Sequence, residues 1–201
     1  MRAARPWEGQ VPCGPVAHRR RSVHGIRTWR PVLGPGGALL LGSVAMRKRW
    51  LPAGKTTWAS CGNRRREAHP AATPAPAGGC TCGLYALHPA TAATSDALAP
   101  VATGPKLEVA GVIEAWGTIH IHREGFRAQY ARPAILLLIG AGRDSDYGRF
   151  VTDLAIAHRA RVVELDEPAA IEPWCSESGI GLSTDQIDAL LTGGEPEPGV
   201  G

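Results

Sequence analysis

Apolar and polar residues alternate most regularly in the second half of the chain, beginning near residue 109. The apolar members of this alternation occupy odd positions: Ile113, Ala115, Ile119 and Ile121. The polar and aromatic members occupy even positions: Trp116, Thr118, His120 and His122. Because the side chains of a β-strand point alternately to its two sides, the pattern predicts a strand with one apolar and one polar face.

The chain then turns at an Arg-Glu-Gly sequence and returns, which predicts a β-hairpin over residues 109–133. On the returning strand, Phe126, Ala128 and Tyr130 are expected to share one face. We expect Pro133 to end this strand, because proline has no backbone N–H to donate to a sheet. The apolar run that follows is then a separate buried segment.

Weaker patterns of the same kind predict the other elements. In chain order they are a hairpin over residues 26–44, a short strand over 56–61, an ordered segment over 80–88, a helix over 146–159 and a strand over 161–165. Ser183 and Gln186 form a capping box before an apolar helical pattern. Strands come first and helices follow, so the predicted fold class is α+β, with a small mixed or antiparallel sheet.

The net charge of +4 conceals a strong asymmetry along the chain. Residues 1–67 carry 14 basic and 2 acidic side chains, a charge of +12, whereas residues 68–201 carry 8 basic and 16 acidic side chains, a charge of −8. We expect residues 1–24 to be a disordered basic arm, or an extension upstream of a misassigned start codon. Residues 25–192 are expected to form one α+β domain, and residues 193–201 a disordered tail.

A basic segment attached to an acidic domain suggests weak association with nucleic acid through residues 1–66. The alternative is that the segment is solvated or folds against the acidic domain. Its arginine clusters contain no interleaved aromatic residues and no motif that reads nucleic acid, so the sequence favours the alternative.

The sequence also suggests where the protein is located. No stretch approaches the roughly 18 apolar residues of a membrane span. The paired arginines near residue 20 are not followed by the cleavage site of an export signal. We therefore expect a cytoplasmic protein, and in a reducing compartment the five cysteines are not expected to form an obligatory disulfide.

Four short motifs stand out as a set. They are Trp50-x-Pro52-x-Gly54 with Ala59-x-Cys61, Cys80-x-Cys82-Gly83-x-Tyr85-Ala86, Gly111-x-Ile113-x-x-Trp116-Gly117, and His122-x-x-Gly125-Phe126-Arg127-Ala128-x-x-Ala131-x-Pro133. The set resembles a pattern of small actinobacterial proteins with no established activity. The resemblance is loose over residues 26–192 and best over residues 80–133. It implies domain limits and a bacterial cytoplasm, and no catalytic residue follows from it.

Two pairs of metal-ligating residues have the spacing of neighbours on one face of a strand. Cys80 with Cys82 and His120 with His122 would together form a Cys₂His₂ set, which is a common tetrahedral zinc site. Cys61 and His69 offer substitutes for members of this set. The alternative is that the cysteines are small buried residues, since Cys-x-Cys is a less favourable zinc spacing than Cys-x₂-Cys. A structural zinc is the only cofactor that the sequence suggests.

Polar and aromatic residues concentrate around the predicted hairpin and suggest a ligand-binding pocket. Its candidate residues are Trp116, His122, Arg127 and Tyr130. With no complete catalytic motif in the chain, the leading hypothesis is a non-enzymatic binding module for a protein or a small ligand, centred on residues 109–133 and 80–88. The alternative from the enzyme class is a cysteine- or zinc-dependent hydrolase using Cys82 and His122.

A glycine-rich segment at residues 140–142 has part of a dinucleotide-binding fingerprint. It follows an apolar run and precedes a predicted helix, but Ser145 occupies the position of the third glycine. Only 35 residues follow Asp166, too few for the rest of such a sheet. We therefore expect an ordinary loop between a strand and a helix.

Overall fold

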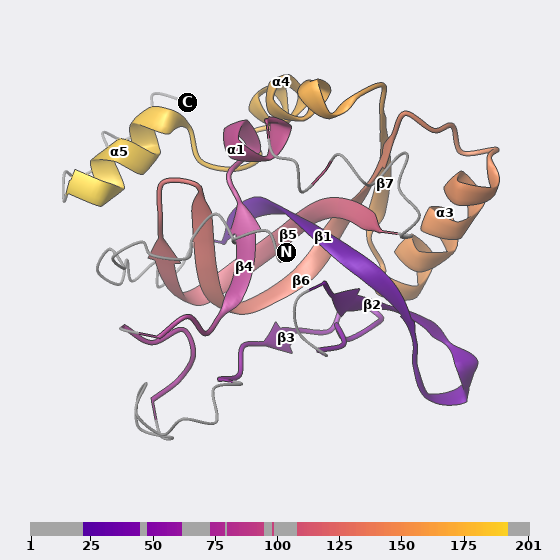
Figure 1. The fold of residues 1–201 in the computed structure, drawn as a ribbon, viewed down its shortest axis with the longest axis horizontal. Helices are drawn as coiled ribbons and strands as arrows, with labels where there is room; N and C mark the ends of the chain where they lie inside the picture. The colour runs from indigo at the N-terminus through magenta and orange to yellow at the C-terminus, as the bar shows by residue number, and fades with distance from the viewer. Residues whose placement is uncertain are drawn as a thin grey trace, which may run out of the picture.

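The computed structural model describes residues 22–44, 48–61, 73–78, 80–94, 98 and 108–192. The strands are β1 (Val23–Leu33), β2 (Leu39–Ser43), β3 (Thr57–Trp58), β4 (Leu84–Leu87), β5 (Val109–Ile121), β6 (Gly125–Ile139) and β7 (Arg161–Leu165). The helices are η1 (Pro35–Gly37), α1 (Pro89–Ala93), α3 (Asp146–His158), η2 (Pro168–Ala170), α4 (Ile171–Glu177) and α5 (Thr184–Thr192). Most helices follow the hairpin-rich sheet in the chain, which confirms the predicted α+β class (Figure 1).

Four strands of the sheet close on one another. β1 pairs with β5, β5 with β6, β6 with β4 and β4 with β1, all antiparallel. The contact that closes this ring is short, because β4 meets β1 only where Leu87 lies opposite Ile26. The predicted hairpins supply the β1–β2 and β5–β6 neighbours, and the insertion of β4 between β1 and β6 closes the ring.

Strand β6 continues through Pro133, so the prediction that proline ends it is wrong. Ile113 lies opposite Pro133 while Val112 lies opposite Ile135, which leaves Ala134 as an extra residue on β6. Such a β-bulge is one of the places where a sheet accepts proline, because the ladder of hydrogen bonds is already interrupted there. The apolar run after the proline is therefore the second half of the same strand.

A second shift in register, between Trp116 and Ile119, changes which residues share a face. The four apolar odd positions of β5 all lie in the main core, as the alternation predicts. Phe126 and Ala128 also lie in that core, but Tyr130 faces the other side, where its ring lies 6.3 Å from the ring of Trp116. The prediction that Tyr130 shares a face with Phe126 and Ala128 is therefore wrong.

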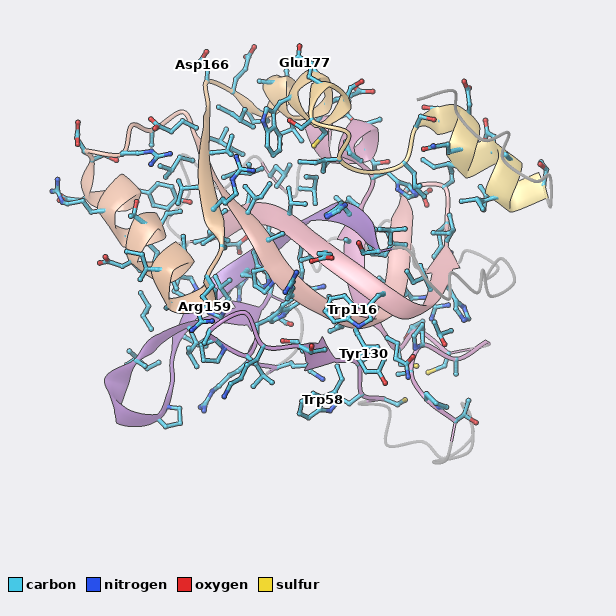
Figure 2. The ribbon with its side chains drawn as sticks, turned by 180° about the vertical axis from the view of Figure 1, so that it is seen from behind. Trp58, Trp116, Tyr130, Arg159, Asp166 and Glu177 are labelled. Atoms are coloured by element: carbon cyan, nitrogen blue, oxygen red, sulfur yellow. The ribbon has the colours of Figure 1, made fainter. Side chains whose placement is uncertain are left out.

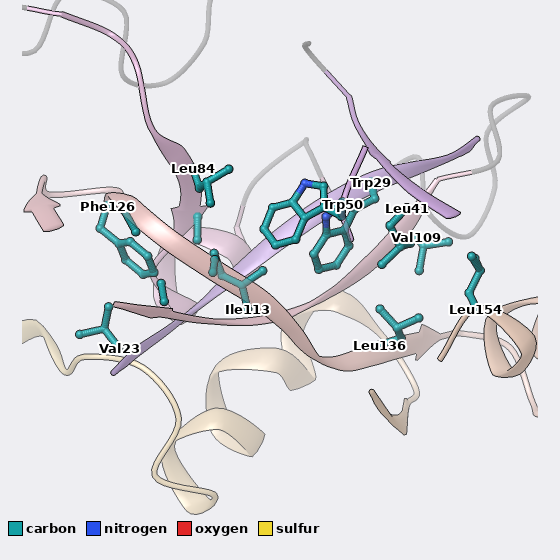
Figure 3. Packing of buried hydrophobic residues seen from close by; sticks show 14 of the residues in the cluster. Val23, Trp29, Leu41, Trp50, Leu84, Val109, Ile113, Phe126, Leu136 and Leu154 are labelled. Atoms are coloured by element: carbon teal, nitrogen blue, oxygen red, sulfur yellow. The ribbon is translucent and has the colours of Figure 1, made fainter. Parts of the chain in front are cut away.

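The main core contains residues of β1, β5, β6 and α3, and Figure 3 shows a part of it. Trp29 and Trp50 are fully buried and meet edge to face, with ring centroids 5.4 Å apart. Aromatic pairs of this geometry stabilise a core beyond the apolar area that they bury. Val151 and Leu154 of α3 contribute to the same cluster, which is why the apolar residues of this helix follow helical spacing.

The segment β6–α3–β7 is a parallel crossover, since β7 pairs in parallel with β6. The glycine-rich residues 140–142 form the loop between β6 and α3, as expected. Ser145 caps the helix, with its side chain accepting a hydrogen bond from the backbone N–H of Gly148. The helix and the following strand confirm the elements predicted over residues 146–159 and 161–165.

The first described strand begins inside the expected basic arm. β1 begins at Val23, so the boundary of the expected arm at residue 24 moves to before this strand. Residues 1–21 and the expected tail at 193–201 lie outside the described residues. At α5 the capping box is confirmed, because Ser183 and Gln186 each accept a hydrogen bond from the backbone N–H of the other. Among the described helices, none has the length and apolar character needed to cross a membrane.

Candidate metal centre

Three cysteine side chains gather at one place in the described part of the chain. The sulfur atoms of Cys61, Cys80 and Cys82 all lie within 4.8 Å of one another. The Sγ atoms of Cys61 and Cys80 are 3.7 Å apart. No disulfide joins the cysteines that the structure describes. A cluster of thiols that is close but not bonded is a candidate site for a soft metal ion.

The sheet explains why these cysteines meet. β3 and β4 both pair with the same edge of β6, Trp58 opposite Tyr130 and Leu84 opposite Ala128. The end of β3 therefore lies beside the start of β4, although more than 20 residues separate them in the chain. Cys61 follows β3, whereas Cys80 and Cys82 precede β4. The cysteines thus lie at the base of the connection between the two strands.

The cluster is apolar on one side and open on the other. Cys80 and Cys82 are buried together with Ala75 and Ala77 in a small hydrophobic cluster. Cys61 is exposed. A metal bound between the sulfur atoms would have protein on its inner side and an accessible position on its outer side.

The surroundings of Cys80 and Cys82 shift the pKa values of their thiols in opposite directions. Burial alone would raise the pKa of Cys80, but hydrogen bonds from Cys82 and Cys61 and the positive charge of Arg127 lower it. Burial raises the pKa of Cys82 to about 11. Cys80 therefore becomes a thiolate, the form that binds metals, more readily than Cys82 does.

Arg127 connects the cysteine segment to the hairpin. Its side chain is buried on β6 and donates hydrogen bonds to the backbone carbonyl oxygens of Cys80 and Cys82, the second at 3.2 Å. Gly83, with a φ of +137°, permits this approach, because a Cβ there would lie 2.9 Å from the Cβ of Arg127. The Cys-x-Cys-Gly motif and the arginine of the returning strand therefore form one structural unit.

The histidines of the predicted Cys₂His₂ set lie on the other side of this arginine. Arg127 Nε donates to Nε2 of His122 at 3.1 Å, and its Nη2 lies 3.3 Å from Nδ1 of His120. Both histidines are buried, and neither belongs to the group of sulfur atoms. The structure thus gathers the cysteine half of the predicted set with Cys61 and places the histidine half beyond the guanidinium.

The buried histidines stay neutral at physiological pH. Burial, followed by the charge of Arg127, lowers the pKa of His120 and lowers that of His122 to about 4. Nδ1 of His122, Nδ1 of His88 and Oε2 of Glu124 are buried and have no hydrogen-bond partner. His88 contacts the hairpin turn, since its Nε2 lies 3.0 Å from the backbone oxygen of His122.

The four predicted ligand-binding residues separate into two pairs. His122 and Arg127 contact each other in the interior. Trp116 and Tyr130 lie opposite each other on β5 and β6, with ring centroids 6.3 Å apart, and both residues are half-buried (Figure 2).

The sequence offered Cys61 only as a substitute ligand, but the structure places it in the cluster. It lies beside Cys80 and Cys82 because β3 and β4 both pair with β6, and local periodicity does not reveal such pairing. His69, the other substitute, lies outside the described residues.

Comparison of the chain with protein-family models, curated proteins and solved structures finds no match. The chemistry of the three thiols and of the side chains around them is therefore the basis on which a function is proposed.

Proposed function

We propose that the chain is a zinc-binding module in which the thiolates of Cys61, Cys80 and Cys82 hold one Zn²⁺ ion. The observation that carries this proposal is the distance between Cys61 Sγ and Cys80 Sγ, 3.7 Å. Two sulfur ligands of one tetrahedral zinc, each about 2.3 Å from the metal, lie about 3.8 Å apart. The Cys61–Cys80 pair therefore already has the separation that zinc requires, and Cys82 Sγ lies within 4.8 Å of both sulfur atoms.

The residues around the sulfur atoms favour zinc in the same way. Three thiolates form a soft ligand set, and a nearby cation helps to offset their negative charge. Arg127 supplies that cation and holds the carbonyl groups on both sides of Thr81. A cytoplasmic location belongs to this proposal, because a reducing compartment keeps the thiols available for a metal.

The role that fits this centre is structural. A metal held by Cys61 and Cys80 would close the long connection between β3 and β4 at its base, beside β6. Closing such a loop reduces the conformational freedom of the unfolded chain. The metal would then fix the segment at residues 80–88 against the hairpin at 109–133, the region of the proposed non-enzymatic binding module.

The alternative of a hydrolase using Cys82 and His122 is less well supported. A general base needs an accessible nitrogen and a pKa near the working pH. Nε2 of His122 accepts a hydrogen bond from Arg127, and the pKa of His122 is lowered to about 4 by burial and by that arginine. Burial also raises the pKa of Cys82 to about 11. Neither residue has the properties of an activated pair.

Cobalt substitution in the purified full chain tests the proposal. Co²⁺ bound to cysteine thiolates has intense thiolate-to-metal charge-transfer absorption, so we expect these bands at one equivalent of metal. Cys61→Ser, Cys80→Ser and Cys82→Ser should each weaken them and lower metal affinity at least about 10-fold. Cys175→Ser is the matched control, because Cys175 is buried in a different core cluster. A spectrum that is unchanged in all three variants would refute the site.

The same spectra identify the fourth ligand. His69 is the only histidine between Cys61 and Cys80 in the sequence. If His69→Ala shifts the cobalt bands while the charge-transfer intensity remains, the fourth position is filled by this imidazole. If the bands do not move, the fourth position is held by solvent or by another donor.

A further inference from the structure

Three aromatic side chains lie in a row on one face of the sheet. Trp58, Tyr130 and Trp116 belong to the neighbouring strands β3, β6 and β5, and Tyr130 lies opposite each of the other two. Figure 2 shows them following one another at one end of the molecule. Since neighbouring strands are about 4.8 Å apart, the three positions span about 10 Å. We refer to these three residues as the aromatic row.

The aromatic row is open to solvent at the edge strand. Trp58 is 56% exposed, a large fraction for a tryptophan. The rings of Trp116 and Tyr130 are inclined by 31°, and Gly117 lets Tyr130 lie close to the backbone. A Cβ at Gly117 would be 2.7 Å from Cδ2 of Tyr130. The bulge that turns Tyr130 away from the core thus creates this surface.

The segment that carries Trp58 is basic. Nζ of Lys48 donates to the backbone carbonyl of Trp58 and lies 3.1 Å from Oγ of Ser60. Arg49 and Lys55 are exposed in the same segment, and residues 48–61 contain no acidic side chain.

Strands β5 and β6 contain one acidic residue, Glu114, and it is already paired. On the sheet next to the aromatic row, Glu114 is held by Arg132 in an ion pair of 2.7 Å. Asp166 and Glu177 lie at the opposite end of the molecule from the aromatic row (Figure 2). By contrast, the described segment that carries Trp58, residues 48–61, has a net positive charge.

We propose that the aromatic row binds single-stranded nucleic acid, with bases stacked on Trp58, Tyr130 and Trp116 and phosphates held by the basic side chains of residues 48–61. Surfaces that bind single strands combine these two features, an aromatic platform and a positively charged border. The three rings offer up to three stacking surfaces, one for each base. This proposal is independent of the zinc centre.

Fluorescence anisotropy of a labelled oligothymidylate about 12 nucleotides long tests the proposal with the full chain as purified. We expect binding at low salt that is tighter than binding of a duplex of the same length, because paired bases cannot stack on the row. Raising the salt from about 50 to 200 mM should weaken this binding, since phosphate contacts release counterions. Absence of binding at low salt, or equal affinity for the duplex, would overturn the proposal.

Substitution of Trp58 separates stacking from charge. Trp58→Ala should lower the affinity about 10-fold with an unchanged salt dependence, whereas Trp58→Phe should retain most of it. Lys48→Gln should instead reduce the dependence on salt. Leu33→Ala is the matched control, because Leu33 is 69% exposed at the tip of the β1–β2 hairpin and should have no effect.

Two other outcomes would also overturn the proposal. If Trp58→Ala binds the oligonucleotide as tightly as the parent chain does, the association is only a general attraction to basic residues. If a neutral oligosaccharide binds in a Trp58-dependent way and the oligonucleotide does not, the row recognises sugars. Zinc content measured on each variant shows whether the metal centre is intact, so failure of one site is distinguishable from failure of the other.

Discussion

Arg127 is the residue through which the metal centre and the hairpin depend on each other. Its guanidinium donates to two carbonyl groups of the cysteine segment and to the imidazole of His122. Buried acceptors that lose their donor cost about 1–3 kcal/mol each. Arg127→Met should therefore lower the free energy of unfolding by about 3 kcal/mol or more in urea, and it should weaken zinc binding at least about 10-fold.

Arg132→Met on the same strand is the control for this variant. Arg132 is 48% exposed and pairs with Glu114 at the surface, so its loss should cost less than about 1 kcal/mol. Equal effects of the two substitutions on stability and on zinc affinity would contradict the role assigned to Arg127.

His122 makes a second prediction at this scale, for the dependence of stability on pH. Burial first, then the charges of Arg127 and His120, lower its pKa to about 4, with His88 acting in the same direction and Glu124 opposing. The unfolded chain, with a histidine pKa near 6.5, binds the proton more readily. The preference for neutral His122 therefore stabilises the folded protein above about pH 6.5, and this contribution is lost as pH falls toward 4.

The comparison that isolates this effect uses His122→Gln, whose side-chain oxygen can still accept from Arg127. Urea unfolding of both proteins between about pH 7 and 4.5 should show the stability of the parent falling more steeply, so that the difference between them shrinks. A difference that stays constant over this range would mean that His122 does not titrate in this way.

At the residue scale, the sequence shows which residues can bind a metal better than it shows which of them lie together. Cys80 and Cys82 were recognisable from their spacing, and His120 and His122 from theirs. Which pair meets which depends on Arg127, whose guanidinium stands between them. The proximity of Cys61 is set by strand pairing at a distance, for which neighbouring residues give no signal.

At the scale of elements, the bulge at Gly117 decides which side chains reach the surface. Gly117 has a φ of +81°, and a Cβ there would lie 2.7 Å from both the Tyr130 ring and the Gln129 side chain. Gly117→Ala should lower the free energy of unfolding by about 2 kcal/mol or more, because backbone strain and a steric clash add together.

Gly36→Ala isolates the backbone part of that cost. Gly36 has a similar φ of +69°, but nothing lies within 4 Å of the Cβ that would be added. Its substitution should cost only about 1 kcal/mol in the same urea experiment. If Gly117→Ala is no more destabilising than Gly36→Ala, the close packing of Tyr130 over this bulge is not important for stability.

The same bulges mark the limit of element prediction from this sequence. Regular alternation located the β5–β6 hairpin and helical spacing located α3, because both depend on residues close together in the chain. β6 continues past Pro133 because Ala134 is an extra residue in this strand. The pairing register also shifts after Trp116, and Tyr130 lies on the other face of the sheet. A change of register depends on the partner strand, so a single strand's pattern does not show it.

At the scale of the whole molecule, the packing of the apolar core and the binding of metal are separable. The large apolar clusters hold the closed ring of strands without any of the three cysteines of the metal centre. The closure of that ring by β4 could not be predicted, since hairpins identify only strands that follow each other in the chain. The three cysteines of the metal centre are thus not part of the main apolar core.

Removal of the metal should therefore weaken the protein without unfolding it. With free zinc at about 1,000 times its dissociation constant, bound metal contributes about 4 kcal/mol, and a strong chelator should lower the urea midpoint accordingly. Near-ultraviolet circular dichroism at 25 °C should remain that of a folded protein, because the tryptophan core does not contain the cysteines. Global unfolding on chelation would contradict this separation.

The central claim is that Cys61, Cys80 and Cys82 hold one zinc ion, and elemental composition with a thiol titration tests it most directly. The tag-free full chain should contain about one zinc per chain, with these three thiols protected until a chelator is added. Cys61→Ser and Cys80→Ser should lose the metal, while Cys175→Ser retains it. A parent protein that contains no metal after purification in zinc, and whose thiols at Cys61, Cys80 and Cys82 react equally with and without chelator, would contradict the account.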